Sequence, residues 1–281
     1  MAKTFNTGPY FDDFDPQNHF YRVLFKPGYA VQARELNQVQ SILQHQVKAI
    51  GNHLFKKNAI VVPGNTILHP NADITSISTA SLAGTTVTDL GYLVGQTLTN
   101  ASSFDYGDDT TLDGYITAVV LAVQNATTTA PAALYLKYYK TQKDGRIYFD
   151  KGETLYTVQS ADVRSTLVVD STIGSTVGKV AVINNGTIYT KDTFVDVEHQ
   201  TVIVEVSNDV VTNATIGLQI IESIVTADED PTLLDNATGY PNEYAPGADR
   251  YRIDLILTKL LASAYPNENE FITLMQIRNN E

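Results

Sequence analysis

The chain has 281 residues, of which 43% are hydrophobic and 18% are charged, a balance that predicts a soluble fold with a substantial core. Its net charge of −12 at pH 7 argues against a nucleic-acid partner, which would require a basic face that releases phosphate counterions. The absence of cysteine excludes disulfides, thiolate metal sites and cysteine nucleophiles. No apolar run approaches the roughly 18 residues of a membrane span, so we expect no membrane partner.

Residues 1–29 are predicted to form an extended arm. Proline-containing turns around Pro16 and Pro27 prevent a compact helix before Ala30. A segment with so many aromatic side chains and so little secondary structure cannot bury them within itself, so it must lie on its own domain or on a neighbouring subunit. We predict the neighbouring subunit. The residues expected in this contact are Tyr10, Phe11, Phe14, Phe20, Tyr21 and Phe25.

Residues 30–57 are predicted to contain one long helix, from about Ala30 to Phe55. Apolar residues recur at spacings of three and four and form one stripe, made of Leu36, Val39, Leu43, Val47, Ile50 and Leu54. The flanks carry neutral Gln and Asn side chains where a solvated helix would carry charges. Such flanks suit a helix that packs against copies of itself, because repeated charges would repel across a symmetry axis. We predict a parallel homotrimer, and the alternative is a helix packed on its own domain.

After Lys57 the apolar runs become short and β-branched, which predicts strands. The expected strands are 59–62, 114–124, 132–139, 146–149, 166–169, 177–183, 187–189, 193–197, 201–206, 217–224, 251–257 and 271–277. Asn184-Asn185-Gly186 is a strong hairpin-turn signal between two of them. There is no alternation of strands with helices and no second long helix.

The predicted fold class is therefore α+β: an N-terminal extended arm and one long helix, followed by a mostly antiparallel β body with a small barrel- or sandwich-like insertion. The body is expected to begin at 58–100 and to return at 192–281. The inserted β-rich domain is expected to occupy 101–191.

The stretch 228–249 is acidic, rich in proline and glycine, and without periodicity. Composition alone favours a flexible connector, but four large apolar residues and three prolines favour an ordered loop that packs across the β body or a neighbouring chain. The residues expected to pack are Leu233, Leu234, Tyr240 and Tyr244.

Patterns for catalysis or metal binding are absent. The stretch 174–179 lacks the spacing of a phosphate-binding loop, and the five histidines lack the spacing of metal ligands. An acidic stretch at 105–113 lacks the spacing of a calcium-binding EF-hand, which favours a solvated loop. We therefore expect no enzyme activity, no catalytic residue, no cofactor and no metal site.

Both ends of the chain contain distinctive stretches: GPYFDDFDP and FYRVLFKPGYAVQARELNQVQSILQHQV near the start, and TFVDVEHQTVIVEV, IGLQIIESIVTADEDPTLLDNATGYPNEYAPGADRYRIDLILTK and FITLMQIRN later. They resemble phage virion proteins that carry the DUF4815 domain. The resemblance implies a structural protein of a tailed-phage particle, of the kind labelled tail-fibre or baseplate components. It brings no catalytic residues, and members often continue past the segment that matches 271–281.

We therefore expect a phage tail protein, made in the host cytoplasm and located in the virion, that joins tail fibre and baseplate through a trimeric base. Its partners would be copies of itself and other tail or baseplate proteins. Two alternatives remain open. One is a receptor-binding tail adhesin, for which Tyr135 and Tyr139 share a strand face. The other is a glycan-cleaving tail enzyme, which would require a pair of carboxylates across a cleft.

Overall fold

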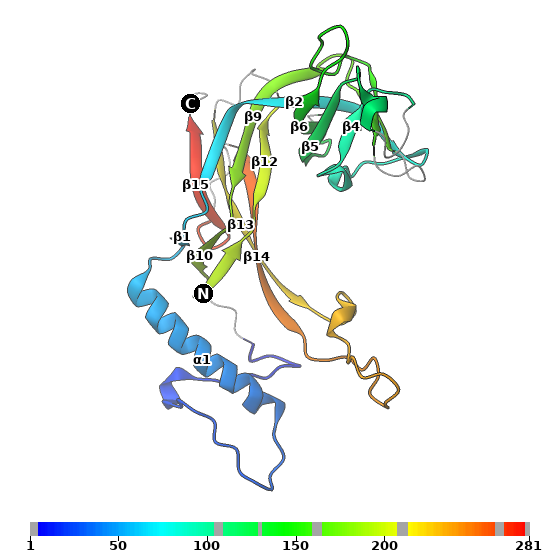
Figure 1. Ribbon diagram of the computed structural model, residues 1–281. Coiled ribbons are helices and arrows are strands. Elements are labelled where there is room, and N and C mark those ends of the chain that lie inside the picture. Colours follow the sequence, from blue (N-terminus) through cyan, green and yellow to red (C-terminus); the bar gives the residue numbers. More distant parts are fainter. Residues whose placement is uncertain are drawn as a thin grey trace.

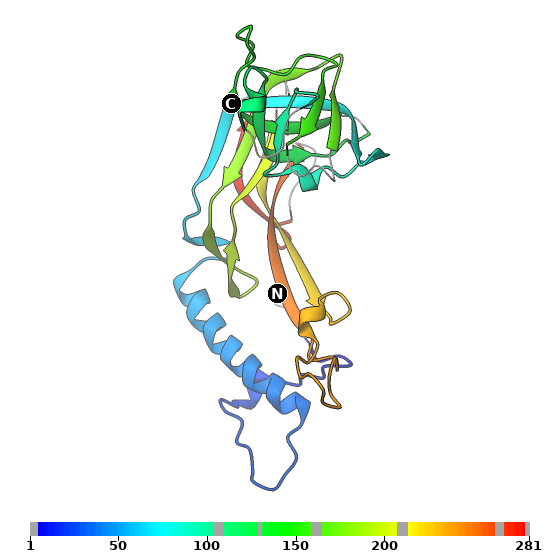
Figure 2. The same cartoon turned by 45° about the vertical axis from the view of Figure 1, so that its right-hand side comes forward.

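The computed structural model describes residues 5–103, 109–128, 131–158, 165–206, 213–261 and 267–278. The molecule is elongated, with the helix and the N-terminal segment at one end, a β body in the middle and a β barrel at the other end (Figure 1). A view turned by 45° shows the same order of parts (Figure 2). The described residues contain one α-helix, and the named strands pair antiparallel. The expected mostly antiparallel β architecture with one helix is confirmed.

Helix α1 (Ala33–Leu54) lies within the predicted segment and begins a little after Ala30. Gly28, with a φ of +84°, adopts a left-handed conformation in the turn before it. The Glu35 carboxylate accepts a hydrogen bond of 2.9 Å from the backbone N–H of Gln32. A carboxylate in the first turn satisfies a free N–H group and lies at the positive end of the helix dipole, so these contacts favour a helix that starts at Ala33.

A long three-stranded ribbon forms the middle of the body. Each of its strands consists of two segments that follow one another along the chain: β1 (Ala59–Val62) with β2 (Thr66–Leu82), β9 (Ser175–Ile183) with β10 (Gly186–Thr190), and β11 (Thr193–Val197) with β12 (Gln200–Glu205). The strand pairing keeps one register across the short break between the two segments of each strand, because Val62 pairs with Thr187 before the break and Thr66 pairs with Ile183 after it. The ribbon thus runs from the helix end of the molecule to the barrel.

A second sheet covers one side of the ribbon. Its central strand β13 (Asn213–Val225) pairs with β14 (Arg250–Leu261) on one side and with β15 (Phe271–Arg278) on the other. Apolar side chains from both layers form the core of the body. Its buried members include Ala181, Ile183, Ile188, Val195, Val204, Ile216, Leu218, Leu255, Leu257 and Ile272.

The predicted hairpin turn at Asn184–Gly186 is wrong. The chain runs straight through these residues from β9 into β10 and reverses instead at Lys191 and Asp192, whose φ angles of 52° and 66° give the turn between β10 and β11. Glycine is required at 186 for a different reason. A Cβ there would lie 2.6 Å from the backbone nitrogen of Gly64 in the adjacent strand, so the glycine permits a close backbone approach at the break in the ribbon.

Strand β2 was not predicted from the sequence. Its 17 residues are rich in Ser and Thr and include Pro70, which lacks the N–H that a strand interior requires. The structure accommodates the proline at a bulge, where the pairing with β9 shifts between His69 and Ala72. The first part of β2 pairs with β9 and the second part enters the barrel, so this one strand connects the two regions.

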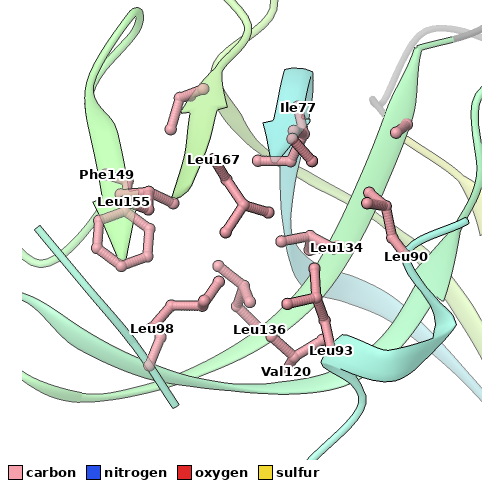
Figure 3. Close-up of a cluster of buried hydrophobic side chains, with 14 of the residues drawn as sticks. Ile77, Leu90, Leu93, Leu98, Val120, Leu134, Leu136, Phe149, Leu155 and Leu167 are labelled. Atoms are coloured by element: carbon pink, nitrogen blue, oxygen red, sulfur yellow. The ribbon is translucent and has the colours of Figure 1, made fainter. Parts of the chain in front are cut away.

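The barrel is a closed ring of six strands: β2, β6 (Ala132–Lys140), β5 (Thr117–Gln124), β4 (Thr97–Thr99), β7 (Thr154–Thr157) and β8 (Ser165–Val169), which returns to β2. Closure satisfies the backbone groups of both sheet edges. Buried apolar side chains fill the interior, as Figure 3 shows; the labelled ones are Ile77, Leu90, Leu93, Leu98, Val120, Leu134, Leu136, Phe149, Leu155 and Leu167. Small elements complete the chain: β3 (Thr85–Thr86), η1 (Pro16–Asn18), η2 (Gly91–Leu93), η3 (Asp109–Leu112) and η4 (Pro231–Leu233).

The barrel does not coincide with the expected inserted domain at 101–191. It begins in the second half of β2 and ends with β8, and the strands β9 and β10 within the expected range belong to the body. The observed boundaries of the barrel differ from the expected ones because β2 belongs to both the body and the barrel. Residues 146–149, expected to form a strand, have no regular secondary structure. Phe149 is buried in the barrel core, and Arg146 forms an ion pair of 2.8 Å with Glu153.

A buried charge cluster lies where barrel and body meet. Lys179 on β9 and Glu205 on β12 approach to 3.6 Å, and only 10% and 4% of their side chains are exposed. Lys259 on β14 donates a hydrogen bond of 2.8 Å to the carbonyl of Val204. Burial lowers the pKa of Lys259, and the nearby Glu205 charge opposes that shift. The Glu205 carboxylate is therefore a buried negative charge that faces the buried Lys179 and the half-buried Lys259.

We predict that Glu205→Leu lowers the free energy of unfolding by about 3–5 kcal/mol, because it removes the buried negative charge that faces Lys179 and Lys259. Asp254→Leu is the matched control, since it breaks the exposed Arg252–Asp254 pair on β14 and should cost less than about 1 kcal/mol. Denaturant titration of the variants gives both values. Equal costs for the two substitutions would contradict the assignment of a desolvated cluster.

Candidate functional site

Helix α1 is attached to the body at its C-terminal end through Tyr189 on β10. Only 1% of Tyr189 is exposed, and its hydroxyl lies 2.9 Å from the Asn52 Oδ1 acceptor on the helix. Phe55 and Phe194 complete an aromatic cluster, with their ring centroids 6.0 Å and 5.1 Å from that of Tyr189. This end of the helix therefore has a fixed position on the tip of the ribbon.

Gly51 makes this attachment possible. Glycine inside a helix costs roughly 1 kcal/mol relative to alanine, so its presence there calls for a packing reason. A Cβ at position 51 would lie 2.4 Å from the Tyr189 ring, far inside the contact distance. The helix can therefore lie directly on the ring only because residue 51 lacks a side chain.

The other end of α1 is attached through the inner arm, by which we mean residues 5–18. Gln38 donates a hydrogen bond of 2.5 Å to the carboxylate of Asp13, and Ser41 donates one to the carboxylate of Asp12. The Asn37 side chain donates to the backbone carbonyl of Tyr10 at 3.1 Å. These contacts all use polar residues of the helix.

The apolar stripe of α1 lies on the side of the helix away from these contacts. At 100° per residue its six members fall within an arc of about 80°, and Asn37, Ser41 and Asn52 lie outside that arc. The exposed fractions are 52% for Leu36, 62% for Leu43, 42% for Val47, 61% for Ile50 and 65% for Leu54, and Val39 is half-buried. An amphipathic helix normally turns its apolar side to its own core, so this helix has the opposite orientation.

The predicted arm contact divides into two groups. Tyr10 and Phe14 pack on their own chain: the Tyr10 hydroxyl donates to Asp249 at 2.6 Å, and the Phe14 ring lies 5.7 Å from that of His45. The hydrogen bond to Asp249 raises the pKa of Tyr10, and burial adds to the shift. Both residues are half-buried against their own chain, and the predicted contact with a neighbouring subunit stays a prediction.

The other four arm residues, Phe11, Phe20, Tyr21 and Phe25, are between 49% and 69% exposed. Three of them belong to the outer loop, by which we mean residues 19–31, which extends past the start of α1 (Figure 2). The outer loop also contains exposed apolar residues that are not among the six expected in the contact. They are Leu24, Tyr29 and Val31, at 74%, 75% and 54% exposed.

The stretch 226–249 joins β13 to β14 and is called the hairpin loop below. Leu234 and Pro246 form a β-bridge across it, and the Asp235 carboxylate accepts a hydrogen bond of 2.8 Å from the N–H of Ala237. Leu233 and Leu234 are half-buried, whereas Tyr240 and Tyr244 are each 70% exposed. Two of the four predicted packing residues thus pack within the loop, and the two tyrosines face outward at its tip.

A groove of about 780 Å³ lies between α1, the inner arm, β11 and β14. Its apolar lining includes Phe14, Leu43, Val47, Phe194 and Ile253, so the stripe of α1 borders the groove. The carboxylates in the lining have partners in the chain, as the 2.8 Å pair between Lys48 and Asp192 shows. At the far wall, burial and a hydrogen bond to Glu222 raise the pKa of Tyr251.

The residues considered for the alternative functions lie elsewhere. Tyr135 on β6 is half-buried and packs against a small core cluster between body and barrel, while Tyr139 is 50% exposed. Asp105 and Asp108 of the acidic stretch lie outside the described residues. Among the described residues no group of three or more His, Asp or Glu side chains is placed to hold a metal ion. No helix in the described part of the chain is long and apolar enough to cross a membrane.

Comparison with known protein families finds one match, to a domain of unknown function, DUF4815, over residues 8–86 and 136–281. The match covers most of the chain, and the chain belongs to the DUF4815 family. The stretch 87–135, which contains β4 and β5 of the barrel, lies outside the match. No curated protein and no solved structure matches the chain.

We predict that Gly51→Ala weakens the attachment of α1 although alanine is the better helix former. The added methyl group must displace the Tyr189 ring, at a cost of about 1–3 kcal/mol. Hydrogen exchange of the α1 amides should accelerate accordingly. In a Tyr189→Leu background the same substitution should be neutral or stabilising, because the obstructing ring is gone. Slower exchange in the single variant would contradict the described contact.

Proposed function

We propose that this chain is a structural component of a tailed-phage particle, in which α1 forms the base of a homotrimer that joins tail fibre and baseplate. The observation that carries the proposal is the exposed apolar stripe of α1. Burial of such a stripe stabilises an assembly by roughly 25 cal/mol per Å² of apolar surface. The assignment to a phage particle is supported by the resemblance of the terminal stretches to phage virion proteins.

The distribution of charge on α1 favours a second copy of the same helix as the partner that covers the apolar stripe. The positive charges of α1 are paired on the opposite side of the helix, Arg34 with Asp13 at 3.4 Å and Lys48 with Asp192 at 2.8 Å. Gln40 and Gln46 flank the stripe, and the one carboxylate beside it, that of Glu35, is bonded to the Gln32 N–H in the first turn. Beyond this first turn, copies of α1 can approach one another around an axis without repulsion between like-charged carboxylates or ammonium groups.

The spacing of the stripe supports a particular bundle geometry. Its first three members recur eleven residues later, since Leu36, Val39 and Leu43 are followed by Val47, Ile50 and Leu54. An eleven-residue repeat corresponds to about 3.67 residues per turn and favours straight or right-handed packing over the left-handed supercoil of a heptad repeat. We propose this geometry for the trimeric base.

We predict that Leu43→Asp converts a trimeric protein into monomers at micromolar concentration. Three carboxylates near one axis would cost several kcal/mol, because each is an unpaired charge in an apolar contact. Ala49→Asp is the control, since it adds the same charge to an exposed position of α1 outside the stripe. Sedimentation or mass photometry measures the mass. A monomeric wild-type protein, or a Leu43→Asp variant that remains trimeric, would overturn the proposal.

A further inference from the structure

The outer loop and the hairpin loop carry opposite charges. The outer loop contains Arg22 and Lys26 and no acidic residue. The hairpin loop contains Asp228, Glu229, Asp230, Asp235, Glu243 and Asp249 and no lysine or arginine. Arg22, Lys26, Asp228 and Glu229 are exposed. The two loops are therefore electrostatically complementary segments of the same chain.

Both loops also present large apolar side chains to solvent. Phe20, Tyr21, Leu24, Phe25 and Tyr29 of the outer loop are at least 49% exposed, and Tyr240 and Tyr244 of the hairpin loop are each 70% exposed. Each large aromatic side chain can bury roughly 150–250 Å² in a contact. Figures 1 and 2 show both loops at the end of the molecule away from the barrel, with their tips apart in both views.

The hairpin loop has a defined conformation before any contact forms. Besides the bridge between Leu234 and Pro246, the Glu243 carboxylate accepts a hydrogen bond of 2.8 Å from the N–H of Gly239, next to Tyr240. A preformed surface loses less conformational entropy on binding than a flexible one. The hairpin loop is thus suited to be the receiving surface and the outer loop the inserted segment.

We propose that the outer loop of one copy docks on the hairpin loop of the next copy in the homotrimer. Arg22 and Lys26 would face the acidic residues, and the aromatic side chains of the two loops would pack together, with additional attraction between the cations and the tyrosine rings. The contact is head-to-tail, because each copy donates one loop and receives another. A head-to-tail contact leaves no outer loop and no hairpin loop unpaired only when the copies form a closed ring, and a trimer is such a ring.

This inference rests on the proposed homotrimer, and the absence of cysteine from the chain permits a direct test. Chains carrying Phe25→Cys and one affinity tag are co-expressed with chains carrying Tyr244→Cys and a second tag. A short bis-maleimide should produce a covalent dimer that carries both tags. Products between identical chains carry one tag only. Tyr148→Cys in place of Tyr244→Cys is the control, since Tyr148 is exposed in the loop after β6 of the barrel and should give no two-tag product.

The charges are tested in the same assay. Arg22→Glu with Lys26→Glu should reduce the yield of the two-tag product roughly fivefold to tenfold at low salt, because attraction becomes repulsion. Asp228→Lys with Glu229→Lys in the partner chain should restore it. An unchanged yield after the first pair of substitutions would overturn the electrostatic basis of the contact.

The outcomes separate this inference from the proposed function. A trimer that gives no two-tag product overturns the loop contact and leaves the helical base intact, as expected if the outer loop binds a different protein. A monomeric protein overturns both. A two-tag product of equal yield with Tyr148→Cys would reflect random collision and would also overturn the contact.

Discussion

Helix α1 uses its polar side to hold its own chain and leaves its apolar side exposed, and the arrangement around it depends on this orientation. Two sets of contacts maintain it: the Tyr189 ring against Gly51 at one end, and the carboxylates of the inner arm at the other. Polar contacts, the aromatic contact at Gly51 and burial of the single apolar residue Ile42 hold the helix, while five of the six stripe residues stay exposed. The helix is thereby presented to a partner in a defined position, which lowers the entropy lost on assembly.

The ribbon connects α1 to the barrel, so the position of the helix also determines where the barrel lies. Its turn at Lys191 and Asp192 contacts α1 through the Lys48–Asp192 pair, and its other end continues through β2 into the closed barrel. The central strand of the ribbon, β9 with β10, is paired on both sides, so the ribbon connects the two ends of the molecule with few loops. In the proposed assembly the ribbon would hold each barrel, with its strands β4 and β5, at the end of the molecule away from α1.

Part of this fold was accessible to pattern analysis. The three- and four-residue spacing located α1 to within a few residues, and β-branched runs located β11 and β15. Local patterns are misleading where a residue serves a long-range contact. Pro70 concealed β2 because a bulge tolerates it, and Gly186 suggested a turn although it relieves a backbone contact with Gly64. Likewise Tyr10 and Phe14 could not be distinguished from Phe11 and Phe25, since all four are aromatic residues in an arm without periodicity.

The sequence by itself determined the local properties: one amphipathic helix with neutral flanks, many short strands, an acidic chain and an aromatic arm. These follow from spacing and side-chain chemistry, which act between near neighbours. The direction in which the stripe of α1 faces, the closure of the barrel through β2 and β8, and the division of the arm into packed and exposed parts were decided only by the tertiary structure. They depend on contacts such as Gly51 with Tyr189, Tyr10 with Asp249 and the β2–β8 pairs, between residues more than eighty positions apart, and no local pattern encodes such pairs.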